Sequence, residues 1–91
     1  MIHRSRTEIT AMILDTANRE TTKTKIMYNA YLSYNQVKEY ISILLENNLL
    51  EYLEGARTFR TTEKGINFLR MYNAMGELLH TTVENDDDEL I

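Results

Sequence analysis

Leu32-Ser33-Tyr34-Asn35-Gln36-Val37 is the stretch that decides how this chain of 91 residues folds. It separates a short segment of helical periodicity from a longer amphipathic one. Ser33 carries the hydroxyl of a helix N-cap, and Gln36 follows at the spacing of a capping box. We therefore expect a helix to begin at Tyr34, directly after a tight turn. Two helices joined in this way form a helix-turn-helix, whose second helix can lie in the DNA major groove.

The residues around this turn carry the helical period that such a motif needs. From Val37 onward, apolar side chains recur at i, i+3, i+4, i+7 and i+8, which predicts a helix from about residue 34 to residue 47. Asn47-Asn48 is expected to end it, because asparagine tolerates the left-handed conformation. Before the turn, Ile26, Met27 and Ala30 predict a short helix that begins near Thr22 or Thr24 and ends near Tyr31. Leu32 is expected to be the apolar plug between the two helices.

A further helix is predicted near the N-terminus. Ser5-Arg6-Thr7-Glu8 has the pattern of a second capping box, and Ile9, Met12 and Ile13 follow at helical spacing. This helix is expected to end near Asn18 or Arg19. Thr21-Thr22 is a polar break that can add a short edge strand.

The helix predicted over residues 34–47 would be the recognition helix of the motif. The segment that follows it has the pattern of a β-hairpin. Leu49–Leu53 and Thr58–Thr62 predict two strands, and Glu54–Arg57 predicts the turn between them. A hairpin placed after a helix-turn-helix is the wing of a winged helix.

The rest of the chain is predicted to be one long helix that ends near Val83. Ile66 and Leu69 are expected to cover the core of the domain. Further apolar residues follow at spacings of four, three and four, which is a heptad seam: Phe68, Tyr72, Met75 and Leu79. We expect this seam to pair with a second copy of the chain, and its packing back onto its own domain is the alternative. Gly76, inside the helix, marks either a close helix approach or a kink.

Composition and charge divide the chain into three parts. Proline is absent and there are only three glycines, which favours a mainly helical domain. We expect a winged helix-turn-helix over residues 1–62, a dimerisation helix of the same compact unit over residues 63–83, and an acidic disordered tail over residues 84–91. The net charge is −4, but five of the fourteen acids lie in that tail. The ten basic residues therefore face nine acids in residues 1–83, a net charge of +1.

Several classes of protein are excluded or disfavoured. The absence of cysteine excludes disulfides, cysteine-ligated zinc and thiol chemistry. No apolar run is long enough to span a membrane, and no apolar core follows Met1–Arg6 as a signal peptide requires. His3 and His80 are isolated, and no nucleophile–base pair, phosphate-binding glycine loop or metal-ligand spacing is present. We expect a cytoplasmic protein that is not an enzyme and has no cofactor, metal or small-molecule ligand.

The order of these elements resembles the archaeal winged-helix DNA-binding proteins of about ten kilodaltons. The resemblance rests on Leu32–Tyr40, Leu44–Leu50 and Phe59–Gly65, and it covers roughly residues 5–80. It implies homodimers that pair through an antiparallel coiled coil of their last helices, with roles in chromosome architecture or transcription. The short final helix and the acidic net charge depart from the pattern, and both favour a regulator over an architectural protein.

The predicted DNA contacts fall on three elements. They are Ser33, Tyr34, Asn35, Gln36, Lys38 and Ser42 on the recognition helix, Lys23 and Lys25 on the helix before it, and Arg57 and Arg60 on the wing. Asparagine and glutamine can read adenine, whereas lysine and arginine reach guanine or phosphate. A solvated polar face is the alternative for the recognition helix, Gln36 can be committed to the cap, and Arg60 can pair with Glu51 instead. Arg4 and Arg6 are further flanking bases.

Three tyrosines, Tyr28, Tyr31 and Tyr34, cluster around the turn. Tyrosine can donate a hydrogen bond to phosphate, but Tyr28 and Tyr40 are expected at the edge of the core.

The sequence thus predicts a homodimeric, nucleoid-associated regulator that binds double-stranded DNA. Its recognition helix would lie in the major groove, and its wing would lie on the backbone or in the minor groove. The alternative is a winged-helix module that binds a protein and not DNA, which the acidic net charge favours.

Overall fold

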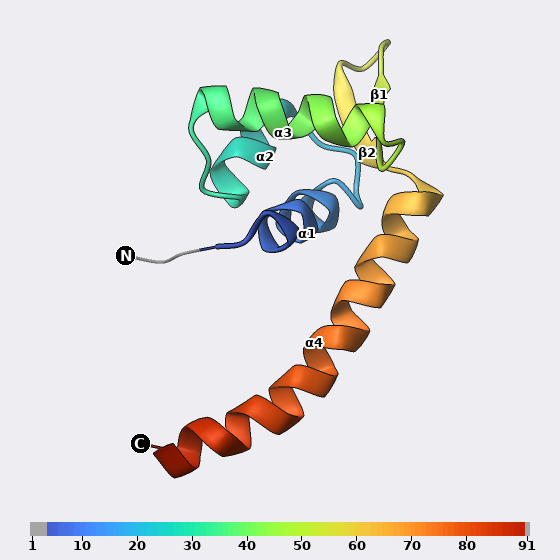
Figure 1. The fold of residues 1–91 in the computed structure, drawn as a ribbon. Helices are drawn as coiled ribbons and strands as arrows, with labels where there is room; N and C mark the ends of the chain where they lie inside the picture. The colour runs from blue at the N-terminus through green and yellow to red at the C-terminus, as the bar shows by residue number, and fades with distance from the viewer. Residues whose placement is uncertain (1–3, 91) are drawn as a thin grey trace.

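The computed structural model describes residues 4–90, with side chains described up to residue 78. The described residues form four helices and one two-stranded sheet (Figure 1). In chain order these are α1 (Arg6–Thr16), α2 (Lys23–Asn29), α3 (Tyr34–Glu46), β1 (Leu50–Leu53), β2 (Thr58–Thr61) and α4 (Glu63–Leu90). The predicted fold class is confirmed: a mainly helical chain with a small hairpin, arranged as a winged helix-turn-helix followed by a C-terminal helix.

Helices α1 and α3 begin at the predicted capping boxes. The Ser33 hydroxyl oxygen accepts from the Gln36 backbone N–H at 3.2 Å, and the Gln36 side-chain oxygen accepts from the Ser33 N–H at 2.9 Å. Ser5 and Glu8 form the same reciprocal pair in front of α1. Because each box satisfies N–H groups that the helix leaves without a partner, the two boxes fix where α1 and α3 begin.

The turn between α2 and α3 is closed by backbone hydrogen bonds. The Tyr31 N–H donates to the Tyr28 carbonyl at 3.2 Å, and the Leu32 N–H donates to the Met27 carbonyl at 3.0 Å. This is a Schellman ending, in which the residue after the C-cap takes a left-handed backbone. Tyr31 is that residue, with a φ of 54°. Leu32 is buried in the core, as its predicted role as the plug requires.

Helix α3 ends with the same motif. The Asn48 N–H donates to the Leu45 carbonyl at 3.1 Å, and the Leu49 N–H donates to the Leu44 carbonyl at 2.9 Å. The predicted stop at Asn47-Asn48 is confirmed, and Asn48, with a φ of 59°, is the left-handed residue.

The core lies where α1, α2 and α3 pack together against the sheet and the first turns of α4. Its largest fully buried side chains are Ile13, Leu14, Ile26 and Val37. Leu69 of α4 is buried with them, and Ile66 packs against them, as predicted. Helix α4 therefore begins as part of the domain and leaves it only afterwards.

The wing is an antiparallel hairpin in which Leu50 pairs with Thr61 and Glu51 pairs with Arg60. Thr21 adds a third segment to its edge: its N–H donates to the Phe59 carbonyl at 2.9 Å, and the Phe59 N–H donates back at 2.7 Å. The short edge strand predicted at Thr21 is thus confirmed as a single bridge.

Two contacts fasten the wing and α4 to the helices. The Thr61 hydroxyl donates to the Leu14 carbonyl at 2.6 Å in a buried position. That carbonyl lies in the last turn of α1, where it has no partner within the helix. Gly65 lies so close to the Leu49 carbonyl that a Cβ there would fall far inside contact distance. The start of α4 can approach the end of α3 only because this residue is glycine.

Helix α4 projects from the domain as one long helix (Figure 1). Its backbone continues to Leu90, so the predicted end near Val83 is wrong, and the backbone is helical in the range where the sequence predicts a disordered tail. The reason is that no glycine or proline follows Gly76 to end the helix. A Cβ at Gly76 would meet nothing within 4 Å, so no other described element of the same chain approaches α4 closely there. Within residues 4–90, no helix has the length and apolar character needed to cross a membrane.

Candidate nucleic-acid interface

The first turns of α3 present a polar face to solvent. Val37, Ile41 and Leu44 point into the core, which leaves the remaining sides of the helix outside. Four of the predicted contacts are exposed on this face: Tyr34, Asn35, Lys38 and Ser42. The structure therefore gives the predicted base-reading residues the exposure they need.

Two other predicted contacts on α3 are engaged in its cap. The side-chain oxygens of Ser33 and Gln36 both accept backbone hydrogen bonds in the capping box. The Ser33 O–H and the Gln36 amide nitrogen can still donate to a ligand, and each of the two oxygens keeps one lone pair. These two residues primarily orient the helix.

Tyr34 brings together two cations from different helices. The Lys23 ammonium, at the start of α2, lies 5.0 Å from the centre of the Tyr34 ring. The Lys38 ammonium, one turn into α3, lies 5.4 Å from the same centre. Both distances are within the range of cation–π attraction, so one ring holds two positive charges at the leading edge of α3. Lys25 is exposed but makes no such contact.

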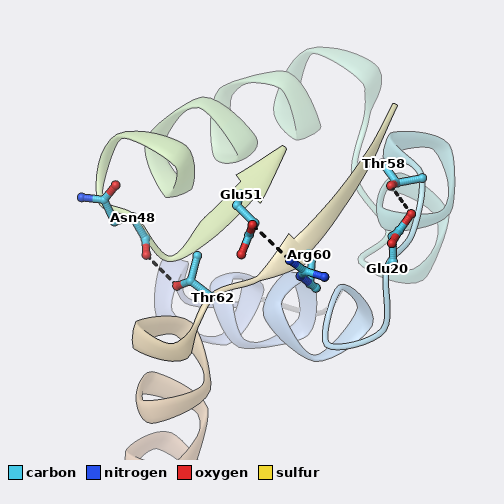
Figure 2. Close-up of polar contacts among 6 residues, drawn as sticks. All are labelled: Glu20, Asn48, Glu51, Thr58, Arg60 and Thr62. Carbon is cyan, nitrogen blue, oxygen red and sulfur yellow. Dashed lines mark hydrogen bonds and ion pairs between the residues drawn. The ribbon is translucent and has the colours of Figure 1, made fainter. Parts of the chain in front are cut away.

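The wing is less basic than its sequence suggests. Arg60 Nη2 lies 3.3 Å from Glu51 Oε1, directly across the hairpin (Figure 2). The Thr58 hydroxyl donates to the Glu20 carboxylate at 2.6 Å, which brings a second acid beside the wing. Of the two predicted contacts, Arg60 is therefore paired, while Arg57 is exposed in the turn with a φ of 55°. The positive charge is therefore stronger beside Tyr34, where Lys23 and Lys38 meet, than on the wing.

Arg4 has a role that the sequence does not reveal. Its Nη2 donates to the Tyr31 carbonyl at 3.0 Å, and its Nη1 donates to the Ala30 carbonyl. Nη1 also lies 3.3 Å from the sulfur of Met12. Helix α2 has no basic residue in its last turn, and a cation is stabilising at the C-terminal end of a helix. Arg4 supplies that cation from 27 residues away.

The three tyrosines around the turn are all exposed. The exposed fractions are 69% for Tyr28, 78% for Tyr31 and 56% for Tyr34. The prediction that Tyr28 lies at the edge of the core is therefore wrong, while Tyr40 does pack against the core. Tyr28 lies near the C-terminal end of the short helix α2, where its ring points away from the packed side that Ile26 defines.

The predicted seam on α4 divides into two parts. Phe68 and Tyr72 are half-buried and stacked, with ring centres 6.4 Å apart, and both pack against the core of their own domain. Met75 is exposed, together with Met71 and Leu78, which lie four residues before and three after it. The side chain of Leu79 lies outside the described residues. The predicted seam does not include Met71 and Leu78. They belong to an adjacent row of heptad spacing on α4, which fits the sequence equally well.

Comparisons with known proteins bear on this architecture. A family model described as winged helix-turn-helix matches residues 3–80. Among solved structures, the chain is similar to Sso10a-2, a DNA-binding protein from Sulfolobus solfataricus. The TM-score is 0.73 and the identity 24%, over 97% of this chain and 98% of that one. A comparison with curated proteins gives no match. At this identity the structural likeness shows a shared fold.

Proposed function

The chain belongs to the winged helix-turn-helix family, and on that basis we propose that it is a homodimeric regulator of transcription that binds double-stranded DNA in the nucleoid. The observation that carries this proposal is the pair of lysine ammoniums, Lys23 and Lys38, held on the Tyr34 ring at the start of α3. Two cations at the leading edge of a recognition helix match the phosphates that flank a major groove. The DNA-binding nature of the Sulfolobus protein, which shares the fold, agrees with this proposal.

The exposed face of α3 supplies the groups that read bases. Asn35 can form two hydrogen bonds with adenine, Lys38 can reach guanine or a phosphate, and Ser42 can contact several bases. All three are exposed on α3, whose start is set by the capping box of Ser33 and Gln36. Their exposure and the fixed start of the helix support recognition in the major groove.

The wing and the neighbouring residues position the protein on the DNA backbone. Arg57, exposed in the hairpin turn, is the stronger wing contact because Arg60 is paired with Glu51. Lys25 adds an exposed cation on α2. Such contacts fix register without reading sequence. With few free cations and two acids beside the wing, the affinity of one domain is expected to be modest and sensitive to salt.

The exposed apolar row on α4 supports the proposed dimer. Met71, Met75 and Leu78 are exposed, and a second copy of α4 would cover them. Two copies would place two recognition helices on one duplex, as operators of two-fold symmetry require. Light scattering should give twice the 10.7 kDa of one chain. Met75→Glu should give the monomer mass, and a monomeric native protein would contradict the proposal.

DNA binding is tested by titration of labelled duplex at several salt concentrations. The native protein should bind at low salt, with an affinity that falls as salt rises. The double variant Lys38→Ala/Arg57→Ala should bind more weakly, with a salt slope lower by about two because two phosphate contacts are lost. Arg70→Ala on α4 removes the same kind of charge away from α3 and should leave the slope unchanged. Absence of binding at low salt, or an unchanged slope in the double variant, would contradict the proposal.

The acids beside the wing favour a second candidate function. Glu20 and Glu51 both engage wing residues, and the chain as a whole is acidic. A winged helix with this charge can instead bind a protein partner through the exposed row on α4. That function is favoured if the duplex titration shows no binding at low salt.

A further inference from the structure

Tyr31 occupies a backbone conformation that favours glycine. It is the residue after the C-cap of α2, with a φ of 54°, and a bulky side chain is strained there. The side chain is also the most exposed of the described tyrosines, so burial contributes little to offset the strain. A strained residue that the fold does not need points to a role in binding.

The surroundings of Tyr31 indicate what it would bind. The Arg4 guanidinium carbon lies 5.9 Å from the centre of the Tyr31 ring, on one of its sides, while the rest of the ring is open to solvent. Tyr28 and Tyr34 lie three residues to either side and are exposed as well. Lys23 and Lys38 are held on the Tyr34 ring. Exposed aromatic rings beside cations are the components of sites that bind single-stranded nucleic acid, in which bases stack on the rings and cations hold the phosphates.

We propose that Tyr31, with the exposed Tyr28 and Tyr34 three residues to either side, is a stacking site for an unpaired DNA base. The Arg4 guanidinium lies over one side of the Tyr31 ring and donates to the Tyr31 carbonyl, so the other side of the ring is left for the base. Lys23 and Lys38 bind the phosphates of the strand that carries the base. This inference rests on the proposed DNA binding and adds a preference for duplexes that contain unpaired bases.

The charges in this cluster favour a nucleic acid over a protein as the ligand. Arg4 lies over the Tyr31 ring, and Lys23 and Lys38 lie over the Tyr34 ring. A phosphodiester strand complements such a surface at every nucleotide, and each base offers a flat face to a tyrosine ring.

The test compares two duplexes of one sequence, one fully paired and one with a short central mismatch bubble. Fluorescence anisotropy gives the two affinities, and an adenine analogue that is quenched by stacking, placed in the bubble, reports direct contact with the ring. The native protein should bind the bubble duplex about tenfold more tightly, as the stacking of one base on an aromatic ring provides.

Tyr31→Gly separates an effect on binding from an effect on folding, because it should weaken binding of the bubble duplex while it stabilises the fold. It should lose the preference for the bubble and the quenching, keep its affinity for the paired duplex, and melt at a higher temperature, since glycine fits a positive φ. Tyr31→Phe keeps the ring and should keep the preference. Asn48→Gly makes the same backbone change at the end of α3, without a ring, and should also keep it.

The outcomes distinguish this inference from the proposed function. Equal affinity of the native protein for both duplexes, or a preference that survives Tyr31→Gly, would refute the stacking site and leave duplex binding intact. Binding of the bubble duplex alone would support the stacking site and contradict the double-stranded DNA proposal. Absence of binding to either DNA would overturn both and leave the tyrosines as a surface for a protein.

Discussion

The Arg4 guanidinium donates to the Tyr31 carbonyl at 3.0 Å and so ties the start of α1 to the end of α2. Arg4→Gln should lower the free energy of unfolding by about 1–2 kcal/mol, because hydrogen bonds from a charged donor are lost at carbonyls that have no helical partner. Urea denaturation measures the change. Arg6→Gln, which removes an exposed pair with Glu39 at 3.9 Å, is the control and should change little.

Arg4→Gln also tests whether this residue touches DNA. If Arg4 only holds the turn, the variant should bind duplex more weakly with an unchanged salt slope. A slope lower by about one would instead show that Arg4 contacts a phosphate itself.

The Thr61 hydroxyl is expected to contribute more to the free energy of unfolding than the hydroxyl of Thr58 on the same strand. Thr61→Val keeps the shape of the side chain but leaves the buried Leu14 carbonyl without its donor, which should cost about 1–2 kcal/mol. Thr58→Val removes an exposed bond to Glu20 and should cost less than about 0.5 kcal/mol. Chemical denaturation of both variants, with equal m-values, checks this order. A reversed order would show that the hydroxyl of Thr61 does not support α1.

Two glycines of α4 should respond to alanine in opposite ways. Gly65→Ala places a methyl group against the backbone carbonyl of Leu49, which cannot move aside cheaply, and should destabilise the fold by about 1–3 kcal/mol. Gly76→Ala places it in open space inside a helix and should stabilise by roughly 0.5–1 kcal/mol. Thermal melting gives both signs, and a neutral Gly65→Ala would mean that α3 and α4 approach less closely.

Release of Arg60 from its partner should strengthen DNA binding. Glu51→Gln removes the carboxylate that lies 3.3 Å from Arg60 and leaves the arginine available to a phosphate. Because exposed pairs of this kind contribute less than about 1 kcal/mol, the affinity at low salt should rise by about two- to fivefold. Glu63→Gln makes the same change in net charge at the first residue of α4. If the DNA affinity of both variants rises equally, the effect is one of net charge and Arg60 does not contact a phosphate.

Features that depend on neighbours within a few residues could be predicted from the sequence. Ser33 and Gln36 form their capping box through bonds between residues three apart, and Asn48 ends α3 through its own backbone preference. The pairing of Glu51 with Arg60 could be foreseen only as one of two alternatives, because both the carboxylate and a phosphate attract an arginine. The structure shows the intramolecular pair.

Contacts between distant segments could not be predicted in the same way. Nothing near Arg4 in the sequence indicates that it caps a helix 27 residues later, because that position depends on how α1 packs against α2. The wing turn contains a glycine, yet the left-handed residue there is Arg57 and not Gly55. On α4, two heptad rows share Met75, and only the packing of Phe68 and Tyr72 against the core decides which row stays exposed.

Three described residues with a left-handed backbone are Tyr31, Asn48 and Arg57, whereas none of the three glycines has a positive φ. Single substitutions of these residues by glycine are therefore expected to raise the melting temperature of the protein. At Tyr31 and Arg57 those substitutions would also remove a proposed contact with nucleic acid. Selection for heat resistance and selection for binding therefore oppose each other at these two positions and not at Asn48. A lineage of this protein that moved to hotter surroundings would be expected to change Asn48 first.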